Sequence, residues 1–210
     1  RNSADVILPR GIGRAPAGAP PLIAIGASTG GTEALREVFE ALPAGLPPIA
    51  VVQHMPEGFT RAFAERLNRS SRVEIVEAAD GLLLGPGQAA IARGDRHLIL
   101  QREGRHWRTE LLDGPSVARH RPSVDVLFRS AAQVAGASAL GVILTGMGDD
   151  GAEGLGEMRE FGAMTIAQDE ASSVVFGMPR VAIERGAAAR IQSLDKIARD
   201  IIAWAQGARG

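Results

Sequence analysis

The chain of 210 residues contains no cysteine. This absence excludes a disulfide framework, a thiol nucleophile and a thiolate metal site, and it suits a reducing compartment. No apolar run approaches the ~20 residues that a membrane-spanning helix needs, and no secretory signal pattern is present. The formal net charge of -1 disfavours a nucleic-acid binder, which is usually strongly basic. We therefore expect a cytoplasmic protein with no membrane insertion and no nucleic-acid partner.

Apolar runs and amphipathic segments alternate along most of the chain. Residues 1–20 are rich in proline and glycine and show little periodicity, which is typical of a linker. Beyond them, β-type patterns predict strands, and apolar residues at helical spacing predict helices. The expected strands are 22–25, 49–52, 73–76, 89–92, 139–144 and 163–167, and the expected helices are 32–42, 59–68, 123–135, 152–161 and 194–205.

Two further β-type runs, 97–101 and 106–112, flank a short turn containing Gly104 and predict an antiparallel hairpin. The loop at 81–87 is rich in turn residues. Strands that alternate with helices imply a parallel sheet covered on both faces. We therefore expect one α/β domain over 21–207, with a mostly parallel, Rossmann-like, doubly wound sheet and an added hairpin.

Three short polar segments each follow an apolar strand pattern. Residues 26–31 supply Ser28, residues 53–56 supply His54, and residues 146–151 supply adjacent aspartates. Parallel α/β sheets place their ligands at the carboxyl ends of the strands. A serine, a histidine and a carboxylate at three adjacent strand ends suit nucleophilic acyl transfer, which needs neither metal nor cofactor.

The serine segment reads Gly-x-Ser-x-Gly from Gly26 to Gly30, which suggests a nucleophile elbow in front of a helix N-terminus. A phosphate-binding loop is the alternative. A dinucleotide fold, however, has glycine where Ser28 stands and an acidic residue at the end of the second strand, which here is Gln53-His54. A nucleotide- or phosphate-binding module remains a second hypothesis.

A neutral imidazole at His54 can take the serine proton. Of the other histidines, His97 and His106 fall in the hairpin and are predicted to be structural, whereas His120 is undecided. A buried, hydrogen-bonded histidine is the plainer interpretation of any one of them.

Asp149 and Asp150 offer a carboxylate that can orient the imidazole, although both can instead cap the following helix. Their spacing does not match a calcium loop. The glycines at 146, 148 and 151 suggest backbone N–H groups close to a ligand, as in an oxyanion hole. The chain order of serine, histidine and acid differs from that of the α/β-hydrolases.

Together these segments resemble the catalytic domain of the chemotaxis protein-glutamate methylesterase family, CheB. The resemblance covers about residues 21–205 and is carried by 23–35, 53–60, 119–125, 143–151 and 175–180. It implies hydrolysis of glutamyl methyl esters on methyl-accepting chemotaxis receptors, with release of methanol and no cofactor. Some members of the family also deamidate receptor glutamines.

The resemblance further implies a triad of Ser28 as nucleophile, His54 as base and Asp150 as orienting acid. It implies that the backbone N–H of Met147 is an oxyanion donor and that Thr29 lines the site. Members usually carry a receiver domain before the catalytic domain, so we expect a longer protein with a receiver upstream.

One departure from the family pattern lies beside the acid, because Asp149 stands where the family has asparagine. Its carboxylate is expected either to raise the proton affinity of the imidazole or to point to solvent. Arg119, Arg121 and Arg180 are candidates for steering acidic receptor helices, or are simply solvated. A scaffold that only docks receptor helices is a third hypothesis.

Overall fold

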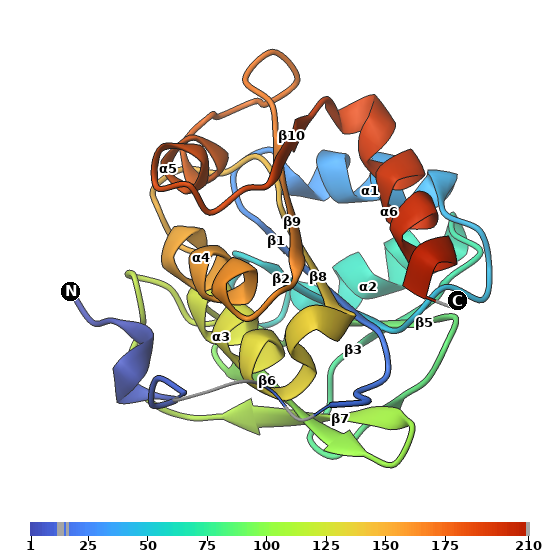
Figure 1. The fold of residues 1–210 in the computed structure, drawn as a ribbon, viewed down its shortest axis with the longest axis horizontal. Coiled ribbons are helices and arrows are strands. Elements are labelled where there is room, and N and C mark those ends of the chain that lie inside the picture. Colours follow the sequence, from blue (N-terminus) through green and yellow to red (C-terminus); the bar gives the residue numbers. More distant parts are fainter. Residues whose placement is uncertain (12–14, 16, 209–210) are drawn as a thin grey trace.

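A seven-stranded parallel sheet forms the centre of the computed structural model, which describes residues 1–11, 15 and 17–208 (Figure 1). The strand order is β10-β9-β8-β1-β2-β5-β3, and every neighbouring pair is parallel. The strands are β1 (Leu22–Ala27), β2 (Ile49–Gln53), β3 (Glu74–Glu77), β5 (Gln88–Ile91), β8 (Ala139–Ile143), β9 (Met164–Gln168) and β10 (Arg190–Gln192). The predicted mostly parallel sheet is confirmed.

Helices cover both faces of this sheet, as the sequence predicts (Figure 1). One face carries α3 (Val124–Ala135), α4 (Ala152–Glu160) and α5 (Met178–Glu184). The other carries α1 (Gly31–Ala41), α2 (Thr60–Arg69) and α6 (Leu194–Ala208). None of the helices in the described ranges is both long and apolar enough to cross a membrane.

The residues of β1 alternate between the two cores. Leu22 and Ala24 face the core beneath α3, whereas Ile23 and Ile25 face the core beneath α1. A Cβ atom on Gly26 would lie 2.2 Å from Cγ1 of Val124, the first residue of α3. Glycine at this position therefore lets the N-terminus of α3 pack directly on the end of β1.

The predicted hairpin forms from β6 (His97–Glu103) and β7 (His106–Leu112). A short strand, β4 (Leu83–Leu84), pairs with β7 and makes a three-stranded sheet, where the sequence pattern indicated only a turn-rich loop. Buried Trp107 donates its indole N–H to the carbonyl of Pro21 at 3.2 Å. This bond ties the small sheet to the segment that leads into β1.

The first residues of the predicted linker lie against the domain. A short 3₁₀ helix, η1 (Ala4–Val6), buries Ala4, and Asp5 forms an ion pair with Arg129 of α3. Residues 12–14 and 16 of the same segment lie outside the described residues. The division into a linker over 1–20 and a domain over 21–207 stays a prediction.

Candidate active site

The three predicted segments meet at the carboxyl edge of the sheet, because β1 lies between β8 and β2. In the parallel register Ala27 pairs with Gln53, so Ser28 and His54 are the next residues of neighbouring strands. The N–H of His54 donates to the carbonyl of Ala27 at 3.1 Å. Asp150 lies in the turn between β8 and α4. The sequence prediction of three adjacent strand ends is confirmed.

His54 and Asp150 form a short, buried hydrogen bond. The distance from Nε2 of His54 to Oδ2 of Asp150 is 2.6 Å, and the two side chains are 7% and 1% exposed. Asp150 also accepts the hydroxyl of Ser123 at 2.8 Å and the N–H groups of Val124 at 2.8 Å and Asp125 at 2.9 Å. Burial alone would raise the pKa of Asp150, but the His54 hydrogen bond and these N–H groups outweigh it and lower the pKa.

The other nitrogen of the His54 ring, Nδ1, is buried and has no hydrogen-bond partner among the described residues. An ionised carboxylate only accepts hydrogen bonds, so Nε2 must carry the proton that faces Asp150. In the neutral ring, Nδ1 then presents a lone pair. The arrangement leaves His54 able to accept one further proton at a defined atom.

Gln53 connects the serine turn to the histidine turn. Its buried side-chain N–H₂ donates to the carbonyls of Ser28 at 2.9 Å and His54 at 3.3 Å. The half-buried Ser28 also donates its N–H to the carbonyl of Thr145 at 2.9 Å, and its carbonyl accepts the N–H of Gly31 at 2.7 Å. Sequence reasoning missed this role of Gln53. The available signal was a polar residue that ends an apolar strand.

The turn that contains Met147 packs against the serine. A Cβ atom on Gly146 would lie 2.8 Å from Cβ of Ser28, so only a glycine fits there. The carbonyl of Gly146 accepts the N–H groups of Gly177 at 3.1 Å and Met178 at 2.8 Å, which fixes the turn. Within the described chain, no hydrogen bond uses the N–H of Met147, and its side chain is 63% exposed.

Two other predicted positions lie at the edge of this group. Thr29 follows Ser28 and is exposed, and its carbonyl accepts the hydroxyl of Thr145 at 3.0 Å. Asp149 binds Arg1 at 2.6 Å and lies 4.0 Å from Arg185. The carboxylate of Asp149 thus pairs with arginine, an arrangement that neither sequence alternative included.

The ring of His120, whose role the sequence leaves undecided, stacks on the ring of His54. The ring centroids of His54 and His120 are 3.5 Å apart, and the rings are 7° from parallel. Burial, followed by repulsion from the His54 ring when that ring is protonated, lowers the pKa of His120. The neutral ring of His120 therefore lies flat against the ring of His54, which faces Asp150.

The remaining histidines lie in the small sheet, as predicted. His97 is buried, its Nε2 lies 2.9 Å from the carbonyl of Pro115, and its Nδ1 accepts the N–H of Ser123 at 3.2 Å. His106 is exposed. The predicted structural role suits His97, which supports the residue that precedes α3.

Two of the three candidate arginines are engaged within the molecule. Arg121 binds Asp95, and Arg180 binds Glu184 at 3.0 Å. Arg119 has no ion pair among the described residues and lines a cavity of about 410 Å³ beside His54. Of the three, Arg119 is therefore the one available to a negatively charged ligand.

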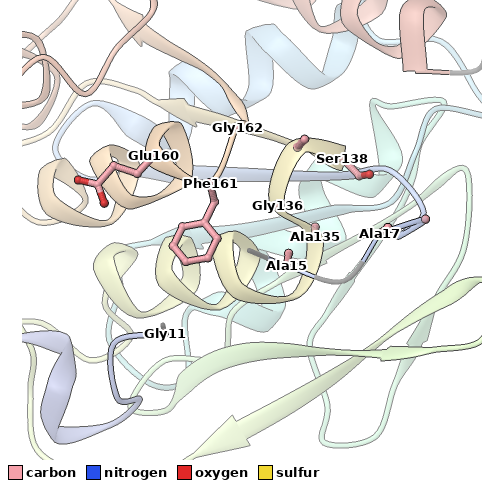
Figure 2. Close-up of a pocket in the computed structure, with 11 residues that line it drawn as sticks. Gly11, Ala15, Ala17, Ala135, Gly136, Ser138, Glu160, Phe161 and Gly162 are labelled. Atoms are coloured by element: carbon pink, nitrogen blue, oxygen red, sulfur yellow. The ribbon is translucent and has the colours of Figure 1, made fainter. Parts of the chain in front are cut away.

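A second cavity, of about 640 Å³, lies at the opposite edge of the sheet, near the amino end of β8 (Figure 2). The described residues that line it come from the ends of α3 and α4 and include Ala15 and Ala17, which Figure 2 labels. Among the described residues that line it, Ser138 and Glu160 are the ones with polar side chains. The described residues also contain no group of three or more His, Asp or Glu side chains placed to hold a metal ion.

Comparison with known proteins identifies the family. Residues 23–201 match the model of the family described as CheB methylesterase. The chain belongs to the CheB methylesterase family. The family resemblance predicted from the sequence is thus confirmed. The parallel sheet with its small antiparallel addition is also the architecture of a solved member of the family.

A solved relative is the CheB methylesterase catalytic domain of Thermotoga maritima, with a TM-score of 0.86 and 38% identity, over 89% of this chain and 99% of that one. Two curated relatives are named protein-glutamate methylesterase/protein-glutamine glutaminase. The one from Geobacter metallireducens is 61% identical over 181 residues, which are 86% of this chain and 51% of the relative. The one from Xanthomonas oryzae pv. oryzae is 57% identical over 207 residues, 98% of this chain and 59% of the relative. The chain thus spans little more than half the length of these relatives.

Proposed function

We propose that this protein is a serine hydrolase that removes methyl esters from glutamate residues of methyl-accepting chemotaxis receptors and deamidates receptor glutamines. The observation that carries the proposal is the buried His54–Asp150 hydrogen bond, with Nδ1 of His54 unpartnered at the strand end beside Ser28. The names of the relatives supply the substrate class. Receptor cytoplasmic domains as substrates imply a cytoplasmic enzyme.

In the proposed first step, Nδ1 of His54 takes the hydroxyl proton of Ser28 while the serine oxygen attacks the ester carbonyl. The resulting imidazolium is stabilised by the ionised Asp150, whose pKa is lowered. Because the serine attack places negative charge on the carbonyl oxygen, an N–H donor is needed beside Ser28. The unused N–H of Met147, in the turn packed against Ser28, is suited to that role.

In the second step the tetrahedral intermediate collapses, and His54 gives its proton to the departing methoxide, so that methanol leaves. Water then attacks the acyl-serine, and His54 takes a proton from that water. As the intermediate collapses, the bond to the serine oxygen breaks, His54 returns its proton to that oxygen, and the glutamate product and the Ser28 hydroxyl are released. With a glutamine substrate the same sequence of steps expels ammonia. Thr29 lines the rim of the site, and Arg119 favours acidic receptor segments.

The nucleotide-binding alternative gives no role to the His54–Asp150 pair, and the docking scaffold gives none to Ser28. The test is methanol release from methylated receptor fragments by the wild-type chain and by Ser28→Ala. We expect the substitution to lower turnover by about 10³-fold or more, because triad members act as a unit. Ser70→Ala, at an exposed serine at the end of α2, is the matched control and should leave turnover unchanged. Turnover by Ser28→Ala close to that of wild type would contradict the proposal.

A further inference from the structure

The first eight residues are anchored to the domain at two places. Ala4 is 5% exposed and packs in a small apolar cluster, to which Ile7 and Leu8 add their side chains. Arg129, only 1% exposed, donates to the carboxylate of Asp5 at 2.6 Å and to the carbonyl of Leu8 at 2.9 Å. We call residues 1–8 the N-terminal strap.

The strap reaches two of the loops that form the candidate active site. The carbonyl of Asn2 accepts the N–H of Ala118 at 2.9 Å, and the Asn2 side-chain amide donates to the carbonyl of Ser116 at 3.1 Å. Arg1 binds the carboxylate of Asp149, the neighbour of Asp150. The apolar side chains of the strap share a cluster with Val117 and Ala118 of that loop, with Val126 of α3 and with Ile99 and Leu112 of the small sheet.

The loop that Asn2 holds has an unfavourable backbone. Ala118 and Arg119 are consecutive non-glycine residues with φ of 47° and 73°, in the left-handed region. Such residues persist only where the surroundings hold them in place. Two hydrogen bonds between Val117 and His120 close the turn from inside, and the two bonds to Asn2 hold it from outside.

His120 is the residue that follows this strained pair, and its ring lies 3.5 Å from the ring of His54. The direction in which Nδ1 of His54 points depends on the orientation of its ring. That ring is fixed on one edge by Asp150 and on one face by His120. A shift of the 116–120 loop therefore changes the orientation of the His54 ring.

We propose that Asn2 and the strap that carries it are positioning elements for catalysis, acting through the 116–120 loop and His120 on the ring of His54. The inference rests on the proposed function, because it concerns the same histidine. No strap residue hydrogen-bonds to Ser28 or His54 within the described structure, so the effect is indirect. Release of the strap should lower the turnover number and change the orientation of the His54 ring even without substrate. It should also raise KM, because Arg119 lies in the same loop.

Three variants test this inference: deletion of residues 1–8, Asn2→Ala, and Val6→Ala as control. Val6 belongs to the strap but is 49% exposed. Turnover and KM are measured by methanol release, the pH profile of kcat is recorded, and the ring signals of His54 are followed by NMR without substrate. NMR reports on the ring even where turnover is low.

We expect the deletion to lower kcat by about tenfold or more, since small misplacements of catalytic groups carry large costs. KM should rise by a smaller factor, because Arg119 moves with the loop. Asn2→Ala should lower kcat by about threefold, which is the change in rate that corresponds to the loss of one exposed hydrogen bond. Both should shift the His54 ring signals and the pH profile, and Val6→Ala should match wild type.

Wild-type kcat, pH profile and ring signals in both the deletion and Asn2→Ala would overturn the inference. If the deletion does not fold, Asn2→Ala decides alone, because it removes only an exposed side chain. A wild-type chain that releases no methanol would contradict the proposed function instead. In that case, the effect of Asn2→Ala on the His54 signals still decides whether the strap positions the ring.

Discussion

Asp125 and Asp150 cap each other's helices. Asp150, in the turn before α4, accepts the N–H groups of Val124 and Asp125 at the start of α3. Asp125, in the first turn of α3, accepts the N–H groups of Gly151 at 3.0 Å and Gly154 at 2.8 Å at the start of α4. Helix N-termini favour negative charge, which helps to hold two buried carboxyl groups close together. Burial, together with the charge of Asp150, raises the pKa of Asp125.

This reciprocal capping predicts different outcomes for two substitutions of Asp125. Asp125→Ala leaves two buried N–H groups without an acceptor and should lower the free energy of unfolding by about 3 kcal/mol. Asp125→Asn keeps an acceptor oxygen and removes a charge near Asp150, so it should remain close to wild type. Urea unfolding measures both. An equal loss in the two variants would mean that the acceptor oxygen of Asp125 is not what stabilises α4.

The stacked pair of histidines predicts that His120 affects turnover without touching the ester. His120→Ala removes the ring that supports His54 and should lower kcat by about tenfold. His120→Phe keeps a flat ring at the position and should retain more activity than alanine. His106→Ala, at an exposed histidine of the small sheet, is the control. If phenylalanine is as damaging as alanine, the planar contact is not the cause.

The absence of a side chain at Gly31, the first residue of α1, leaves room for Gln53, which connects the serine and histidine turns of the site. A Cβ atom there would lie 2.1 Å from Oε1 of Gln53, the side chain that binds the carbonyls of Ser28 and His54. Gly31→Ala should therefore displace Gln53 and lower kcat at least about tenfold, since it separates the two turns.

The control for this prediction is Gly156→Ala in α4. The nearest atom to a Cβ at Gly156 is 3.8 Å away, so the added methyl group is accommodated. In a helix, alanine is favoured over glycine, and this variant should keep full activity and gain up to about 1 kcal/mol of stability. Methanol release and urea unfolding, measured on both variants, separate a local effect on Gln53 from a general effect of alanine. Equal kcat in the two variants would refute the role given to Gln53.

Local sequence patterns predict those parts of the fold and site that depend on neighbouring residues. The sequence shows the apolar runs of β1, β2 and β8, each followed by polar residues. On the assumption that these strands are adjacent, this pattern predicts that Ser28, His54 and Asp150 lie at one edge of the sheet. The three residues of β10 and the two of β4 are too few to show a period. The helix α5 begins at Met178-Pro179 and has seven residues, which also leaves its pattern weak.

Contacts between segments that are far apart in the sequence could not be predicted from local patterns. The stacking of His120 on His54 depends on a loop with two non-glycine residues at positive φ, a conformation that no local preference predicts. The ion pair between Arg1 and Asp149 joins the start of the chain to the turn before α4. Only the packing of the strap against the domain brings these two groups together.

Two histidines whose pKa values are lowered in the folded chain, His97 and His120, predict a loss of stability in mild acid. Burial, which outweighs the hydrogen bond to Pro115, lowers the pKa of His97 in the folded chain from its usual value of 6.5, and burial lowers that of His120 as well. Below that usual value the unfolded chain binds more protons than the folded chain, so the free energy of unfolding rises with pH. The stabilisation from the neutral rings is therefore complete above pH 6.5 and is lost as the pH falls from 6.5 through the folded pKa values.

Protonation of His97 also destroys a specific contact, because Nδ1 can no longer accept the N–H of Ser123. Urea unfolding at pH 7 and pH 5 should show a lower free energy of unfolding at pH 5. In His97→Gln, which has an amide that does not titrate, this difference should shrink, whereas His106→Gln at the exposed position should keep it in full. An undiminished difference in His97→Gln would assign the acid sensitivity to His120 or to the carboxylates. His97, which supports Ser123 and through it Asp150, would then play no part in the acid sensitivity of the fold.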